Sequence, residues 1–257
     1  MQKYLAIINR QTLYILVLCL GIAYFCRQFQ FWFSLNTTLF SIAVVFPLVF
    51  TIRESFKRRD NLIKLLSVFK TSMNAVYHCF VDNAKLEPEK KQFVNDSLVG
   101  ISSLFLEALQ SQKKYDEQAV SAKMNELFDF VHSNSDKIPN SVAMKVIRFL
   151  KDVHESMENT VGLKMHGTPV SLRAYCLVFI YVFPFVFIPT LAHDLQENSA
   201  WILYALSAIH GFILISLYNV QDDMEDPFDQ VGLDDIKLES FGFFNAPAVS
   251  KPEMEPF

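Results

Sequence analysis

Three large apolar residues, Ile42, Phe46 and Phe50, recur every four positions in an uncharged stretch that leads into the cations Arg53 and Lys57. At helical spacing their side chains stack along one slowly turning stripe, with both cations close to its continuation. Two interpretations fit this pattern. The stripe could be the aromatic side of a membrane helix packed against its neighbours. Alternatively, it could line a pore, where large side chains form a constriction and rings of cations favour anions.

The rest of this stretch can be assigned in the same way. The residues on the other faces are expected to pack against further membrane helices; these are Val44, Val45, Leu48 and Val49. Pro47 stands between two stripe positions and has no N–H to donate to the carbonyl of Ala43, so we expect it to kink the helix.

Composition favours a membrane protein over a soluble one. Hydrophobic residues make up 51% of the 257 positions, with 25 Phe and only 7 Gly. The stretches apolar enough to be membrane helices are residues 13–26, 35–52, 174–192 and 200–220. The first has only 14 residues, so either flanking residues such as 6–8 or 29–33 extend it or the bilayer thins. A signal peptide is disfavoured, because no small-x-small cleavage site follows.

Residues 53–172 form a polar block whose apolar residues recur at helical spacing. Breaks near residues 86–89, 112–116, 138–141 and 166–169 divide it into four helices, which we expect to form a bundle. The predicted fold is therefore all-α, with four transmembrane helices and a cytosolic helical bundle. Its predicted parts are transmembrane helices 1 and 2 (1–55), the cytosolic helical region (56–168), transmembrane helices 3 and 4 (169–220), and an acidic cytosolic C-terminal tail (221–257).

The basic residues predict the orientation of the chain in the membrane. With four spans, one side collects nearly all of them, namely Lys3, Arg10, the 53–59 cluster, Lys164 and Arg173. Because such residues concentrate in cytoplasmic loops, both termini and the helical block should be cytosolic, in an inner or plasma membrane. Residues 222–257 hold ten acids and two lysines, and this tail could dock on the more basic body, bind cations or be solvated.

Signs of an enzyme are missing. The chain has no hydrolase elbow, P-loop, dinucleotide fingerprint or HExxH motif, and its four scattered cysteines are expected to be free. His210 lies deep in an apolar stretch, where we expect a neutral ring satisfied by a neighbouring helix. Asp222, Asp223 and Asp226 are weak candidates for a divalent-cation site. We therefore predict neither catalysis nor a nucleic-acid partner.

Two short motifs resemble a known family. Glu225-Asp226-Pro227-Phe228, directly after the last apolar stretch, resembles the E/N-x-Pro-Phe signature of the bestrophin family, particularly of its bacterial-type members. Residues 166–175, with Pro169 ahead of the third stretch, look like the family's short proline-containing start of that helix. The order of four spans, with a large helical block between the second and third, also agrees.

The resemblance carries over to single positions. Ile42, Phe46 and Phe50 fall on the family's pore neck, and Arg58 falls on the arginine at the inner end of that helix. Val170 matches the apolar residue that narrows the inner vestibule, the cytosolic aperture. The resemblance thus implies a homopentamer whose five second helices surround an axial pore for chloride or other small anions, with the inner mouth charged by Arg53, Lys57 and Arg58.

The chain also departs from the family. Arg59-Asp60 stands where an aromatic pair is usual, and Asp229 replaces a glycine. Residues 230–233 (Gln-Val-Gly-Leu) replace the acidic run with which animal members clasp calcium, so we expect no cofactor and regard calcium as a disfavoured ligand. The alternative functions are a cation-conducting relative and a non-conducting membrane scaffold that binds a partner through its cytosolic helices.

Overall fold

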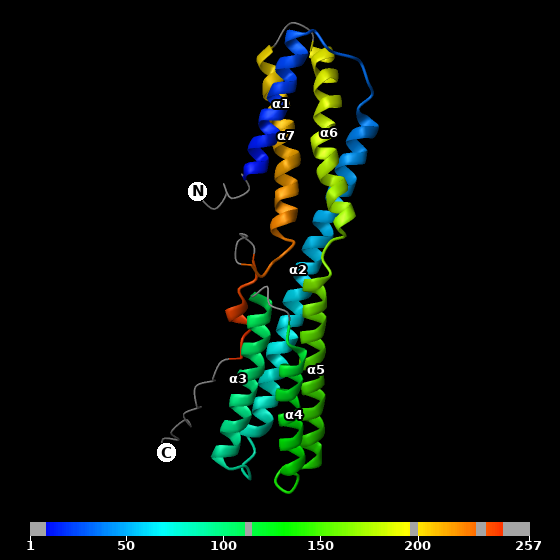
Figure 1. The fold of residues 1–257 in the computed structure, drawn as a ribbon. Coiled ribbons are helices and arrows are strands. Elements are labelled where there is room, and N and C mark those ends of the chain that lie inside the picture. The colour runs from blue at the N-terminus through cyan, green and yellow to red at the C-terminus, as the bar shows by residue number, and fades with distance from the viewer. Residues whose placement is uncertain (1–8, 111–114, 196–199, 230–234, 244–257) are drawn as a thin grey trace, which may run out of the picture. The chain divides into compact units, whose positions relative to one another are not determined.

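The computed structural model of the protein describes residues 9–110, 115–195, 200–229 and 235–243, and these form helices without any strand (Figure 1). The all-α prediction is therefore confirmed for this part of the chain. The chain divides into two compact units, one made of Met1–Asp60 with His166–Asp235 and the other of Asn61–Met165 with Ile236–Phe257. Helix α2 (Thr38–Val81) contributes its first part to one unit and the remainder to the other.

The first unit, here called the apolar unit, contains α1 (Arg10–Gln28), the beginning of α2, α6 (Val170–Leu195) and α7 (Ala200–Asp223). Four helical runs are long and apolar enough to cross a membrane: α1, α2, the run Asn140–Leu195 that includes α6, and α7. These four runs support an integral membrane protein. The short first stretch is lengthened by residues 10–12 and 27–28 rather than by residues 29–33.

Helix α1 begins at a capping box, in which Asn9 accepts a hydrogen bond from the backbone N–H of Thr12 and Thr12 accepts one from that of Asn9. Thr12 also accepts a 3.0 Å bond from the Asn219 amide of α7. Gly211 permits the close approach of the same two helices, since a Cβ there would lie 2.6 Å from Cys19 Sγ. Small and hydrogen-bonding residues are typical of helix contacts within membranes.

One apolar core fills this unit, with buried residues from all four helices: Ile15, Cys19, Ala23, Cys26, Val44, Leu48, Cys176, Ile180, Phe183, Ile188, Leu203, Leu214, Ile215 and Tyr218. In α2 only one side faces this core. Val44, Leu48, Thr51 and Ser55 follow one another at intervals of four, three and four residues and are all buried.

The second unit, here called the polar unit, contains the later part of α2 with α3 (Pro88–Gln110), α4 (Glu117–Ser133) and α5 (Asn140–Met165), which lie side by side in Figure 1. The predicted breaks at 86–89 and 138–141 contain the starts of α3 and α5, but α2 and α4 end earlier, at Val81 and Ser133. Most of the predicted break at 112–116 lies outside the described residues. Asp116 caps α4 by accepting a 3.0 Å bond from Ala119 N–H. Lys164 of α5 donates to the carbonyls of Ala108 and Leu109 near the end of α3, which otherwise lack helical donors.

Phenylalanines pair in the core of the polar unit. Phe69 of α2 packs on Phe105 of α3 with ring centroids 4.7 Å apart, and Phe130 of α4 contacts Phe80 and Phe93. Residues 236–243 pack onto the same bundle, with the side chains of Ile236, Leu238 and Phe243 buried. The four cysteines are free, as predicted.

Candidate functional site

The predicted neck residues lie on the side of α2 that its own chain leaves open. Ile42, Phe46 and Phe50 are 46%, 56% and 54% exposed. Phe46 lies two residues from both Val44 and Leu48, which places it about 200° around the helix from each of these buried side chains. The described chain therefore leaves about half of the surface of each of these side chains uncovered.

The expectation for Val45 and Val49 is wrong. Both were assigned to the packed faces of α2, but they are 41% and 50% exposed, whereas Val44 and Leu48 are buried as expected. The reason is that only one narrow stripe of α2 meets the core, and Val45 is turned about 100° from Val44. The exposed part of the helix surface therefore extends from the stripe to the side of Phe46 that carries Val45 and Val49.

The cations after the stripe fall into two kinds. Arg53 and Lys57 are exposed, and so is Glu54 between them. Arg58 is instead held in an ion pair, with Nη2 2.8 Å from Glu225 Oε2 and both side chains largely buried. The same Nη2 also donates to the backbone carbonyl of Glu225 at 3.2 Å.

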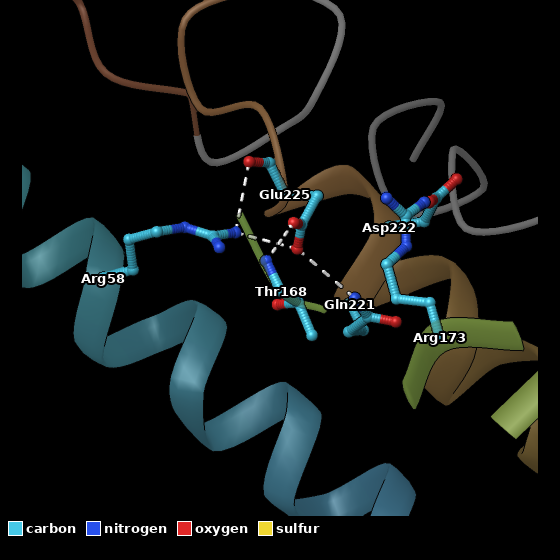
Figure 2. Close-up of polar contacts among 6 residues, drawn as sticks. All are labelled: Arg58, Thr168, Arg173, Gln221, Asp222 and Glu225. Atoms are coloured by element: carbon cyan, nitrogen blue, oxygen red, sulfur yellow. Dashed lines mark hydrogen bonds and ion pairs between the residues drawn. The ribbon is translucent and has the colours of Figure 1, made fainter. Parts of the chain in front are cut away.

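Figure 2 shows how the surrounding residues complete this cluster. The backbone N–H of Thr168, in the link before α6, donates to Glu225 Oε1 at 2.6 Å. Gln221 of α7 donates to Oε2 at 3.4 Å. The carboxylate thus joins α2, the start of α6 and the end of α7, because each of them supplies a donor to one of its oxygens. Charge-assisted bonds of this kind are stronger than neutral ones.

The link before α6 must pass very close to this carboxylate. A Cβ at Gly167 would collide with Glu225 Oε1, so the bond from the next residue, Thr168, depends on a glycine here. Burial of the carboxyl group raises the pKa of Glu225, but the bonds and charge of Arg58 and the N–H of Thr168 outweigh it, and the pKa lies below its ordinary value. Glu225 is therefore an anion at neutral pH.

The remaining signature residues form a turn. Asp226 Oδ1 accepts a 3.3 Å bond from the backbone N–H of Phe228, and the Phe228 ring is buried. An aspartate that bonds the backbone two residues on is a common turn former, and a following proline suits it because proline fixes φ. The motif thus combines an anchor, the Glu225 carboxylate, with a turn formed by Asp226 and a buried ring at Phe228.

The weak metal candidates gain no support. Asp222 forms an ion pair with Arg173 of α6, and in the described ranges no group of three or more His, Cys, Asp or Glu side chains could hold a metal ion. Residues 230–234, which include Asp234 and the stretch that replaces the calcium-clasping run, lie outside the described residues.

Two further predicted residues are positioned as follows. Val170 is the first residue of α6 and is 79% exposed, so its side chain is available to line an opening. The ring of His210 stacks on Phe187, with centroids 4.1 Å apart, and makes a tilted contact with Phe183 at 5.1 Å. Its buried Nε2 has no hydrogen-bond partner in the described part of the chain, so aromatic stacking replaces the expected polar contact.

The sequence did not predict the contacts that join these elements. Arg58 and Glu225 were each singled out, but nothing paired them, and Gly167 was only part of a motif. Tyr175 was only the last residue of the motif at 166–175, whereas its hydroxyl donates to the carbonyl of Ala43. The one usable signal was charge. Arg58 follows the second predicted membrane helix and Glu225 follows the fourth, so two opposite charges were predicted on the same side of the membrane.

Comparison with known proteins identifies the fold of this chain. No protein-family model and no curated protein matches the chain. Among solved structures, three variants of a bacterial Bestrophin homolog from Klebsiella pneumoniae align with TM-scores of 0.76, 0.74 and 0.74, each at 14% sequence identity. The alignments cover 90% of this chain and 92%, 94% and 94% of those chains. The chain therefore has a bestrophin-like fold.

Proposed function

We propose that this chain, with its bestrophin-like fold, assembles in the lipid bilayer as a homopentamer and conducts chloride or other small monovalent anions through an axial pore. The observation that carries the proposal is the open stripe of Ile42, Phe46 and Phe50, which lies opposite the buried side of α2. A single copy supplies only one side of a channel. Five copies with this stripe toward a common axis would form a narrow apolar neck.

An apolar neck suits the control of ion flow for two reasons. A narrow ring of large apolar side chains loses water easily and so can close without a moving gate. The edges of aromatic rings carry partial positive charge, which favours a passing anion. Phe46 and Phe50 lie along one side of the helix with centroids 6.1 Å apart, so each would contribute its own ring.

The inner mouth of this pore takes its charge from exposed residues. Five copies of Arg53 and Lys57 would raise the positive potential there, and the exposed Glu54 would offset part of it. Arg58 contributes less net charge than its position implies, because Glu225 holds it. Val170 would form the cytosolic aperture, supported by its exposed place at the start of α6.

The proposed membrane placement follows the sequence. Residues 1–55 and 169–220 carry the transmembrane helices, while residues 56–168 and the tail 221–257 are cytosolic, as are both termini. The membrane would be an inner or plasma membrane.

Purified full-length protein tests the assembly and the current together. We expect a detergent-solubilised particle with the mass of five copies, and in proteoliposomes a current whose reversal potential follows the chloride gradient. A reversal potential that follows the cation gradient would assign a cation channel. A particle of one or two copies without current would overturn the proposal and favour a scaffold.

The neck assignment has its own test. Replacing Ile42, Phe46 and Phe50 together by alanine should retain the pentamer and increase or ungate the current. The matched control is Val45→Ala, an exposed residue of the same helix that lies about 100° around it from Phe46. Equal currents from the two variants would remove the stripe from the mechanism.

A further inference from the structure

A backbone carbonyl inside the proposed neck receives its hydrogen bond from another helix. Pro47 lies within α2 and has no N–H, so the carbonyl of Ala43, four residues earlier, lacks its helical donor. The hydroxyl of Tyr175 in α6 donates to this oxygen at 3.2 Å. Both residues belong to the apolar unit.

This hydrogen bond is suited to a membrane helix. Hydrocarbon offers no water to satisfy a freed carbonyl, and side chains of neighbouring helices commonly take over after a proline. The Tyr175 ring packs against Phe179 on the same helix, with centroids 4.3 Å apart, which restricts the directions in which the hydroxyl can point. Tyr175 is 38% exposed, and removal of its oxygen alone would leave the ring contact with Phe179 intact.

The position of the bond gives it a consequence for conduction. Ala43 directly follows Ile42 and precedes Phe46 by three residues, so the carbonyl lies between two neck positions. Tyr175 follows Val170 by five residues on α6, the helix that begins with the proposed aperture. The bond thus ties the segment that carries the neck to the helix that carries the aperture.

We propose that Tyr175 is a positioning residue of the pore, which fixes the neck segment of α2 by supplying the donor that Pro47 removes. The expected effect on current rests on the proposed channel function. The hydrogen bond does not, because both of its residues belong to a single chain.

A double-mutant cycle tests the inference in purified full-length protein. Tyr175→Phe removes only the hydroxyl, and Pro47→Ala returns a backbone N–H to the Ala43 carbonyl. Tyr175→Phe alone should lower the thermal midpoint in detergent by about 3 °C and change the ratio of open to closed channels in proteoliposomes by about threefold. In the Pro47→Ala background the same substitution should change neither quantity, because the carbonyl no longer needs the tyrosine.

Two controls keep the result interpretable. Tyr14→Phe removes a hydroxyl from an exposed tyrosine of α1 and should change neither quantity. If Pro47→Ala does not assemble, Pro47→Ser also restores the N–H and replaces it in the cycle.

The possible outcomes separate the inference from the channel proposal. Equal effects of Tyr175→Phe in both backgrounds, or none in either, would overturn the positioning role while leaving a conducting wild-type protein as a channel. A wild-type protein without current would overturn the channel, and the thermal midpoints of the four proteins would still decide whether Tyr175 compensates for Pro47.

Discussion

Helix α2 contains two sets of phenylalanines with opposite environments. Phe69 and Phe80, in the polar unit, are 0% and 1% exposed, whereas Phe46 and Phe50, in the apolar unit, are more than half exposed. The partner of Phe69 is Phe105 of another helix, but the nearest ring contact of Phe46 is Phe50 of its own helix. The same residue type on one helix thus completes a core in one unit and remains available to something outside the chain in the other.

This contrast divides α2 into two parts. The structural part includes Phe69 and Phe80, and the open part includes Phe46 and Phe50. Aromatic burial is a large favourable contribution to folding, so a stripe of exposed phenylalanines is stable only in a medium or against a partner that accepts it. Hydrocarbon and further copies of the chain both meet this condition. The two parts should therefore respond differently to truncation.

The largest effect is expected in the structural part. Phe69→Ala should lower the free energy of unfolding by about 3–5 kcal/mol, because it leaves a cavity against Phe105 that the bundle fills only partly. Chemical denaturation of the detergent-solubilised protein measures it. A loss under about 1 kcal/mol would show that the contrast between the two parts of α2 has no energetic basis.

The next largest effect is expected for the ion pair of Arg58 with Glu225. Glu225→Gln or Arg58→Gln should each destabilise the protein by about 2–3 kcal/mol, because each leaves a largely buried charge without its partner. The double replacement should cost less than the sum of the two. Additive losses in the same denaturation experiment would mean that the two side chains do not act as a pair.

Acid should reproduce part of this loss. The pKa of Glu225 is lowered in the folded state, so the stabilisation from its ionised form is fully present above its ordinary value of 4.5 and is lost as the pH falls through the lower folded value. Unfolding measured from pH 7 to pH 3 should therefore show a steeper fall for the wild type than for Glu225→Gln. Parallel profiles would contradict the depressed pKa.

The smallest effect is expected in the open part. Phe46→Ala should change the free energy of unfolding by less than about 1 kcal/mol, because the ring contacts little of its own chain. Leu48→Ala, two residues away on the buried side, is the control and should cost about 2–5 kcal/mol. If the two substitutions cost the same, the stripe is ordinary packing, and the pore assignment loses its main support.

Much of the fold could be predicted because hydrophobicity is a local signal. Apolar runs located all four candidate membrane helices, and the predicted breaks located the starts of α3 and α5 but not the ends of α2 and α4. Val45 and Val49 were misassigned because periodicity gives the angle between side chains around a helix, but not how much of the helix surface the neighbouring helices cover. Only the positions of α1, α6 and α7 decide how much of α2 is covered.

The contacts of the candidate site were harder to predict. Arg58 and Glu225 are 167 residues apart, and their pairing depends on how the middle of α2 meets the residues that follow α7. The orphan carbonyl at Ala43 followed from the chemistry of Pro47, but its donor did not, because any hydroxyl on a neighbouring helix could have filled that role. The sequence thus identified unsatisfied groups without identifying their partners.

The collision that a Cβ at Gly167 would make with Glu225 sets a rule for sequence variation. Relatives that keep glutamate at position 225 should keep glycine at position 167, since an added methyl group would displace the carboxylate from the Thr168 N–H. A shorter aspartate at position 225 would relax this restriction, and alanine or serine at position 167 should then be tolerated. The two positions should therefore change together across an alignment of related chains, although 57 residues separate the bonded pair Thr168 and Glu225.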